Sequence, residues 1–296
     1  MPSFRHQVLT WVIPRVRGSG EVHGAEAVER LRRELLAAQA NADPSPPRRV
    51  ERVLDVRRFE IAGMPVFDLR VPGTAPVRTV LYLHGGGFVS GLDRFHWRYA
   101  ARLARRLGVR VVLPAYPLAP EHTWKDATPP LVELFEQVAV ESAHGVVLMG
   151  DSAGGGLTVL LAQQVARRPG PQPTHLVVFA PWLDLTGETP GTAEAAERDP
   201  WLNLSKLRIY GGWWGGGQPP AAEASPLAND LSGLPPTLMF CGTRDVLHPQ
   251  AVALVAAAER AGVPMTFVEG PGLLHVYPIL PIPESRAAFE RVEAFL

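Results

Sequence analysis

Hydrophobic and polar residues follow a helical period at the start of the chain and a strand period further along. Within residues 1–45, apolar positions such as Val28, Leu31 and Leu35 recur at helical spacing, with arginine and glutamate between them. This pattern predicts amphipathic helices that end in the proline-rich stretch 41–47. From residue 48 to residue 71 the apolar positions follow the closer spacing of strands.

The N-terminal stretch 1–15 is apolar enough to be compared with a secretion signal. Pro14 interrupts it, and no small-residue cleavage site follows. We therefore expect an amphipathic helix there and not a signal peptide.

Beyond a turn at 71–76, predicted strands and helices alternate. Strands are predicted at 78–83, 109–113, 146–149, 175–179, 237–240 and 265–268, and helices at 94–107, 131–140, 157–167, 251–261 and 284–296. Elements that alternate in this way form a largely parallel sheet with helices on both faces. The predicted fold class is therefore α/β.

A long segment, 182–224, interrupts the alternation and is rich in tryptophan and glycine. It is longer than a crossover between parallel strands requires. It follows the carboxyl end of the predicted strand at 175–179, and α/β proteins place their sites at the carboxyl ends of strands. We expect an N-terminal helical cap segment at 1–45, a core at 46–181 and 225–296, and a cap insertion at 182–224 that forms a lid.

Composition narrows the classes of partner. The chain has 29 basic and 29 acidic residues, so its net charge gives no reason to expect nucleic acid or an anionic membrane. No stretch approaches the roughly 18 apolar residues of a membrane span, and we expect a cytoplasmic protein without stable membrane insertion. The single cysteine, Cys241, stands in an apolar run and is predicted to be a buried core thiol. Edge strands and the last helix are candidate surfaces for a homodimer.

The sequence also gives no sign of a cofactor or metal. Its histidines are scattered, it has no His-Glu-x-x-His, and neither a phosphate loop nor a dinucleotide fingerprint is present. We expect no cofactor and no metal.

The stretch Gly150-Asp151-Ser152-Ala153-Gly154 follows one predicted strand and precedes a predicted helix. A serine hydroxyl is a weak nucleophile unless it is exposed beside a base, and a sharp strand-to-helix turn exposes it. A Cβ at Gly150 or Gly154 would crowd such a turn. The pentapeptide alone arises by chance in glycine-rich loops, so the flanking strand and helix carry the prediction that Ser152 is a nucleophile.

Three consecutive glycines, Gly85, Gly86 and Gly87, follow His84 at the end of the strand at 78–83. Such a run allows the backbone to approach another group closely. Acyl transfer creates an oxyanion that preorganised N–H groups stabilise, and this motif is typical of an oxyanion hole that partners a nucleophile elbow. The alternative interpretation is a flexible loop.

Asp245 and His275 each follow a later predicted strand. An acid at Asp245 would orient a histidine, and His275 would take the proton of Ser152. The chain order Ser152, Asp245, His275 matches that of α/β-hydrolases. His248 is a weaker candidate for the base, and His84 is expected to shape the glycine loop. Asp151 neighbours the nucleophile, but the elbow is expected to point it away, and Asp184, Asp199 and Asp230 are weaker candidates for the acid. The remaining histidines are expected on the surface or in strands: His6, His23, His96, His122, His144 and His175.

With these motifs, the chain resembles the hormone-sensitive-lipase-like family of bacterial esterases and lipases. The resemblance rests on the segments 84–91, 116–122, 150–155 and 242–247 and on the block at His275, and it spans roughly residues 50–296. It implies an α/β-hydrolase fold with a helical cap and hydrolysis of short- to medium-chain carboxylic esters without a cofactor. It also implies oxyanion N–H groups from Gly86, Gly87 and Ala153, with Gly85 supporting the turn. Pro117 departs from the family, which usually has arginine there.

The predicted function is that of a serine carboxylesterase that acts on a small-molecule ester. Aromatic residues are predicted to line its substrate pocket, with packing of cap on core as the open alternative: Phe88, Trp182, Trp213 and Trp214. An amidase or acyltransferase would use the same three catalytic residues. A ligand-binding protein on a hydrolase scaffold is a further alternative, but the presence of Ser152, Asp245 and His275 argues against it.

Overall fold

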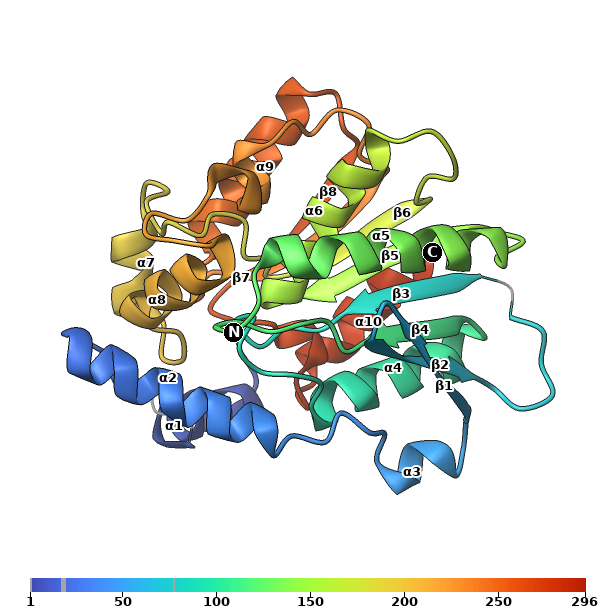
Figure 1. Cartoon of the computed structure of the whole chain (residues 1–296), viewed down its shortest axis with the longest axis horizontal. Helices are drawn as coiled ribbons and strands as arrows, with labels where there is room; N and C mark the ends of the chain where they lie inside the picture. The colour runs from blue at the N-terminus through green and yellow to red at the C-terminus, as the bar shows by residue number, and fades with distance from the viewer. Residues whose placement is uncertain (1, 17–19, 77) are drawn as a thin grey trace.

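One eight-stranded sheet forms the centre of the molecule (Figure 1), and the computed structural model describes residues 2–16, 20–76 and 78–296. The strand order is β1-β2-β4-β3-β5-β6-β7-β8. The strands are β1 (Asp55–Ile61), β2 (Met64–Arg70), β3 (Thr79–Leu83), β4 (Arg110–Pro114), β5 (Val146–Asp151), β6 (His175–Phe179), β7 (Thr237–Gly242) and β8 (Met265–Gly270). Among the described strands, β2 pairs antiparallel with both β1 and β4, and all other neighbours pair parallel, so the predicted α/β class with a mostly parallel sheet is confirmed.

Burial of the strands explains their composition. Every residue of β3, β4, β5 and β7 is buried, as expected for strands covered on both faces. The edge strand β1 is mostly exposed and carries charged residues. Pairing in register places Leu83 beside Gly150 and Asp151 beside Phe179. The carboxyl ends of β3, β5 and β6 therefore meet at one edge of the sheet.

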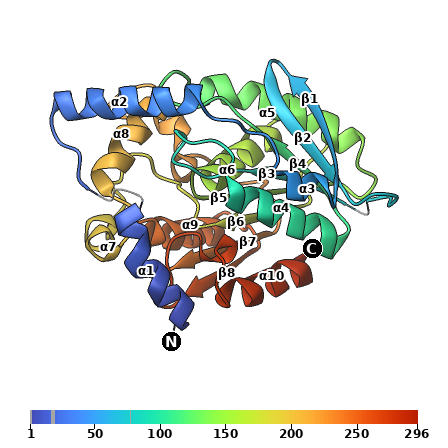
Figure 2. The same ribbon diagram turned by 90° about the horizontal axis from the view of Figure 1, so that it is seen from below.

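Five helices cover the two faces of the sheet (Figures 1 and 2). Helices α4 (Arg94–Leu107) and α10 (Glu284–Phe295) lie on one face, and α5 (Trp124–Val140), α6 (Ser152–Ala166) and α9 (His248–Arg260) lie on the other. The predicted range of α4 is confirmed. Asp93 caps its start by accepting the N–H of Phe95, and Gly108 ends it in a left-handed conformation.

Several boundaries differ from the prediction, and two of these differences have a clear local cause. A short helix, α3 (Arg48–Glu51), occupies the start of the range predicted as strand, and its Val50 is buried. Helix α5 begins at Trp124 and not at 131, because Thr123 and Asp126 form a capping box at its start. The helix continues through two prolines, a residue type that normally disfavours a helix interior.

Four helices lie beside the carboxyl ends of the strands in both views (Figures 1 and 2). They are α1 (Phe4–Val16), α2 (Ala25–Ala40), α7 (Thr192–Arg198) and α8 (Leu204–Gly215). All four come from the two segments predicted to form the cap; residues 1 and 17–19 of the first segment lie outside the described residues. Three short 3-10 turns complete the elements: η1 (Ala222–Ala224), η2 (Pro226–Ala228) and η3 (Tyr277–Ile279). Among the described helices, none has the length and apolar character that crossing a bilayer requires.

Candidate active site

Ser152 stands at the junction of β5 and α6, where the strand turns directly into the helix. Its φ of 53° lies in the left-handed region, which residues other than glycine rarely adopt. A Cβ on Gly154 would lie 2.2 Å from the carbonyl oxygen of Leu83, and one on Gly150 would lie 2.4 Å from Thr158 Oγ1. The sharp turn predicted from the sequence is therefore present, and both glycines are required by close contacts.

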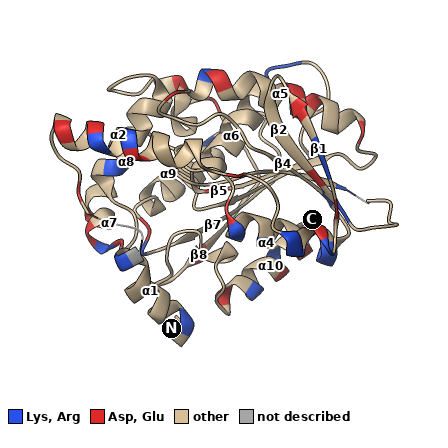
Figure 3. Ribbon diagram, turned by 60° about the horizontal axis from the view of Figure 1, so that its bottom comes forward, with Lys and Arg blue, Asp and Glu red and all other residues tan. Residues whose placement is uncertain are grey.

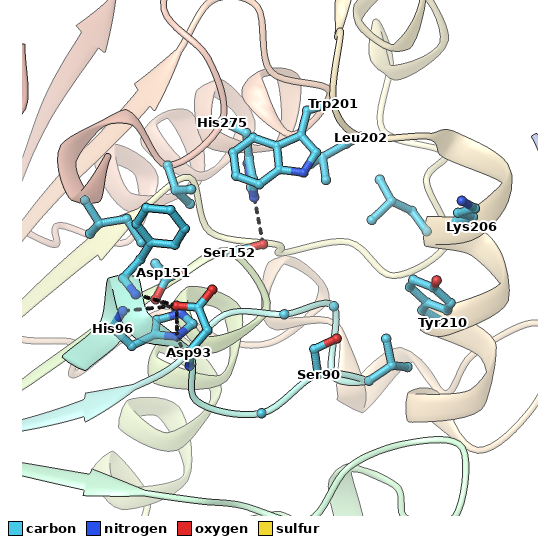
Figure 4. Close-up of a pocket in the computed structure, with 18 of the residues that line it drawn as sticks. Ser90, Asp93, His96, Asp151, Ser152, Trp201, Leu202, Lys206, Tyr210 and His275 are labelled. Carbon is cyan, nitrogen blue, oxygen red and sulfur yellow. Dashed lines mark hydrogen bonds and ion pairs between the residues drawn. The ribbon is translucent and has the colours of Figure 1, made fainter. Parts of the chain in front are cut away.

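The structure brings Ser152, His275 and Asp245 together in one hydrogen-bonded series. His275 Nε2 lies 2.8 Å from Ser152 Oγ (Figure 4), and His275 Nδ1 lies 2.7 Å from Asp245 Oδ2. Asp245 Oδ1 accepts the N–H of Leu247 at 2.9 Å. When the Nδ1–H group donates a hydrogen bond to the Asp245 carboxylate, Nε2 carries no proton. Nε2 can then accept a hydrogen bond from the serine hydroxyl.

The three side chains are buried, which strengthens the effect of nearby charges. Burial alone would lower the pKa of His275, but the charge and hydrogen bond of Asp245, followed by the charges of Asp199 and Asp151, raise this pKa above its ordinary value. The site therefore favours the protonated, imidazolium form of His275.

The glycine loop after β3 borders the same cavity as Ser152. Gly86 and Gly87 line this cavity, with φ values of 121° and 64° that favour glycine. Within the described part of the chain, neither of their N–H groups donates a hydrogen bond. Ala153 is the second residue of α6, where a backbone N–H has no acceptor within the helix. Gly86, Gly87 and Ala153 thus offer N–H groups of the kind that an oxyanion requires.

A buried ion pair lies behind the glycine loop (Figure 4). Asp151 Oδ1 accepts the N–H of Gly85 at 3.1 Å and the hydroxyl of Tyr82 at 2.7 Å, and it lies 3.5 Å from His96 Nε2. Burial alone would lower the pKa of His96, but the carboxylates of Asp151 and Asp93 raise it to about 10. Within the described residues, the hydrogen bonds of the Asp151 carboxylate go to Tyr82 and Gly85, and none goes to Ser152 or His275. The expectation of a surface or strand position for His96 is wrong, because this side chain is buried on α4.

His84 supports the glycine loop as predicted. Its ring stacks on Tyr116 with centroids 4.2 Å apart, and the Tyr116 hydroxyl donates to the carbonyl of His84 at 2.6 Å. Burial, and then the positive charge of His96, lowers the pKa of His84 to about 4. The neutral imidazole contacts the carbonyl of Gly85 through Nδ1 at 2.8 Å, so His84 stabilises the loop conformation.

A cavity of about 310 Å³ opens over Ser152 (Figure 4). Its volume is at the lower end of the range for small-molecule sites. Apolar and aromatic side chains from distant segments form most of its wall: Leu35, Val89, Phe95, Trp201, Leu202, Leu207, Tyr210, Ile279 and Leu280. Polar side chains also reach it: Ser90, Asn203 and Lys206.

The four aromatic residues predicted to line a substrate pocket do not line this cavity. Phe88 stacks on Trp214 with centroids 4.2 Å apart and lies 5.4 Å from Trp182, and all three are buried. Trp213 lies against Tyr210, 5.8 Å between centroids. These residues pack the insertion on the core, which was the alternative interpretation. The sequence indicates that such side chains are buried but not which of them face a cavity.

Two more residues at the site were not foreseen as contributors. His6, expected at the surface or in a strand, is buried on α1, and its Nε2 accepts the N–H of Leu274 at 3.0 Å. Asp199, considered only as an alternative acid, accepts the N–H of Val246 at 2.8 Å. Both contacts join parts of the chain that are far apart in sequence, and no local pattern signals them.

The remaining candidates have other partners. His248 begins α9, and its Nε2 lies 2.7 Å from Glu269. Cys241 is buried as predicted, with Sγ 3.7 Å from Asp245 Oδ2. Over the ranges that the structure describes, no group of three or more histidine, cysteine, aspartate or glutamate residues is arranged to hold a metal ion.

Known proteins resemble this chain in sequence and in structure. Residues 80–279 match the family model for the alpha/beta hydrolase fold. An acetyl-hydrolase from Streptomyces hygroscopicus is 35% identical, over 76% of this chain and 77% of its own length. An esterase from Acinetobacter venetianus is 27% identical over 82% of each chain.

Solved structures of other proteins are also similar to this chain. A crystal structure of an esterase from the bacterial hormone-sensitive lipase family has a TM-score of 0.81 at 28% identity, covering 100% of this chain and 98% of its own. A structure of EstE5 soaked with p-nitrophenyl butyrate has a TM-score of 0.82 at 26% identity, covering 99% and 97%.

Proposed function

This chain belongs to the α/β-hydrolase family and, within it, to the hormone-sensitive-lipase-like bacterial esterases, and we propose that it hydrolyses short- to medium-chain carboxylic esters with Ser152, His275 and Asp245. The observation that carries this proposal is the hydrogen-bonded series Ser152–His275–Asp245, which borders a cavity lined by Gly86 and Gly87.

In the first half of the reaction, Ser152 Oγ attacks the ester carbonyl carbon while its proton passes to His275 Nε2. The carbonyl oxygen becomes an oxyanion, which accepts hydrogen bonds from the N–H groups of Gly86, Gly87 and Ala153. Asp245 stabilises the imidazolium. Collapse of the intermediate breaks the bond to the alcohol oxygen, and His275 gives its proton to the departing alcohol.

In the second half, water attacks the acyl group on Ser152, and His275 Nε2 takes the proton of that water. The second oxyanion uses the same N–H groups. Its collapse releases the carboxylic acid and returns a proton from His275 to Ser152 Oγ. The cycle needs no cofactor, because the chain's own groups supply each proton transfer.

The size of the cavity supports a preference for small acyl groups. Its volume of about 310 Å³ must hold both the acyl and the alcohol parts of the ester. Leu35 of α2 and Tyr210 of α8 contribute to its wall, and we propose that α1, α2, α7 and α8 together form the cap. The soaking of the similar EstE5 with p-nitrophenyl butyrate supports a four-carbon acyl group as a first substrate.

The test is hydrolysis of p-nitrophenyl esters from acetyl to palmitoyl by the wild type, S152A and S285A. Ser285 is also buried, but its hydroxyl donates only to the carbonyl of Ile282. S152A should lower kcat by about 10³-fold or more, while S285A should stay near the wild type. Activity should peak at short to medium chains. Undiminished turnover by S152A would refute the assignment of the nucleophile, and a maximum at palmitoyl would refute the proposed chain length.

A further inference from the structure

Asp199 lies where the predicted cap insertion meets the catalytic residues, just after α7. Its carboxylate accepts three backbone N–H groups. Oδ1 accepts from Trp201 at 2.7 Å and from Leu202 at 3.0 Å, and Oδ2 accepts from Val246 at 2.8 Å. Charge-assisted hydrogen bonds of this kind are stronger than those between neutral groups, so this side chain firmly joins two segments.

Both segments contact the catalytic histidine. Trp201 and Leu202 line the cavity, and the Trp201 ring meets the His275 ring edge to face, with centroids 5.5 Å apart. In the second segment, Val246 directly follows Asp245, whose carboxylate is hydrogen-bonded to His275 Nδ1. One carboxylate therefore connects the wall over His275 to the loop that orients it.

We propose that Asp199 is a positioning residue for this reaction, whose carboxylate keeps the Asp245 loop and the Trp201–Leu202 wall in register around His275. The inference rests on the proposed ester hydrolysis and adds to it a residue of the cap insertion. No ordinary sequence signal marks Asp199, because it acts through Trp201, Leu202 and Val246 and touches neither Ser152 nor the glycine loop in any contact of the described residues.

The charge of Asp199 gives this role a measurable signature. Burial and the like charge of Asp245 raise the pKa of Asp199 to about 6, and this rise is opposed by the N–H groups of Val246 and Leu202 and by the charge of His275. In turn, the negative charge of Asp199 adds to that of Asp245 in raising the pKa of His275. Removing the charge should lower the pKa of His275 and move the acid limb of the activity profile to lower pH. Replacing a residue that contributed only to stability would not change the pH at which activity falls on the acid side.

The central variant is D199N. An asparagine has one carbonyl oxygen, so it cannot accept from Val246 and from the Trp201–Leu202 pair as two carboxylate oxygens do. The matched control is D184N, since Asp184 belongs to the same insertion and its carboxylate also accepts backbone N–H groups, from Thr186 and Thr189. Asp184 does not line the cavity.

The measurement is kcat and KM for p-nitrophenyl butyrate from pH 5 to pH 9, with circular dichroism to verify folding. D199N should lower kcat by about 10- to 100-fold, as expected for misplaced catalytic groups, and should shift the acid limb to lower pH. D184N should keep the limb in place and kcat within about twofold of the wild type. A D199N variant with unchanged kcat and an unshifted limb would overturn the proposal.

Two further measurements apply if D199N does not fold or if the proposed ester hydrolysis is wrong. If D199N does not fold, D199E keeps the charge with an altered reach; it should retain the wild-type acid limb at reduced kcat, and wild-type kcat would count against the proposal. If the wild type hydrolyses no ester, the function proposed above fails. D199N and D184N can then still be compared by the rate at which a fluorophosphonate labels Ser152. Slower labelling of D199N than of D184N supports the positioning role, and equal labelling refutes it.

Discussion

In the proposed mechanism, the pKa of His275 controls activity at low pH, because Nε2 must be unprotonated to accept the proton of Ser152. Burial would lower this pKa, but Asp245 and the neighbouring carboxylates raise it in the folded protein. The protonated form is therefore already abundant at a pH where a free histidine, with a pKa of about 6.5, is half neutral. Activity should be lost as the pH falls through the raised value.

We predict that kcat/KM for p-nitrophenyl butyrate falls with an apparent pKa above 6.5 and decreases about tenfold per pH unit below it. The profile of kcat/KM reports the free enzyme, whose hydrogen bonds are those described here. The measurement is initial rates at low substrate from pH 5 to pH 9, in buffers of constant ionic strength. A flat profile, or a midpoint below that of free histidine, would contradict the assignment of His275 as the base.

Among the elements, α4, β5 and the glycine loop are joined by the ion pair of His96 and Asp151. Asp151 belongs to β5, His96 to α4, and Gly85 of the loop donates to the same carboxylate. A Cβ on Gly85 would lie 2.3 Å from Asp151 Oδ2, so the loop and the carboxylate are in close contact. Loss of the cation would leave a buried carboxylate without its ionic partner, which is strongly destabilising.

We predict that H96L lowers the free energy of unfolding by about 3–5 kcal/mol near pH 6, measured by urea denaturation. H144L, at an exposed position, should change it by less than about 0.5 kcal/mol. The pKa of His96 is raised to about 10, so the stabilising effect of its charge is fully present below the unfolded pKa near 6.5 and is lost as the pH rises toward 10. The difference between H96L and the wild type should therefore shrink at pH 9.5. A difference independent of pH would indicate lost packing and not a lost charge.

The same elements show what the sequence predicts well. Strands such as β3 and β5 are continuous apolar runs, and Ser152, Asp245 and His275 each follow a strand, so parallel pairing alone brings their segments to one edge of the sheet. The glycine turns were also predictable, because close backbone contacts admit only glycine there. These features depend on local pattern and on the rule that parallel strands end together.

Contacts between distant segments were not predictable in this way. The partner of His6 is 268 residues away in the chain, and the partner of His96 belongs to another element. Burial of these histidines follows from helix packing and not from neighbouring residues. The same reason explains the error about the pocket aromatics: Phe88 and Trp214 stack on each other, and no periodicity in the sequence distinguishes such a stack from a cavity wall.

Across the whole molecule, the cavity is the point where the core and the outer helices meet. Charged residues of both signs lie on the outer helices and on β1 (Figure 3), whereas the cavity wall is mostly apolar. Leu35 from α2, Tyr210 from α8 and Ile279 from η3 contribute to one wall. Because these segments are remote in sequence, the size of the cavity is a property of the complete fold, and the acyl-chain preference should depend on the residues that the proposed cap contributes.

Tyr210 offers the most direct test of this dependence. It lines the cavity, and its ring lies 3.2 Å from the position that a Cβ on Gly87 would occupy, so it closes the cavity near the proposed oxyanion site. We predict that Y210A raises the ratio of kcat/KM for p-nitrophenyl decanoate to that for the acetate by about tenfold or more, since each added methylene contributes about 1–3 kcal/mol in an apolar pocket.

The matched control is I209A, because Ile209 is the adjacent residue of α8 and does not line this cavity. The ratio for I209A should remain within about twofold of the wild type. Comparing a ratio of two esters within each variant removes any common loss of kcat through destabilisation. If Y210A and I209A gave the same ratio, chain length would be selected elsewhere in the molecule, and the small cavity over Ser152 would not be the determinant of the substrate.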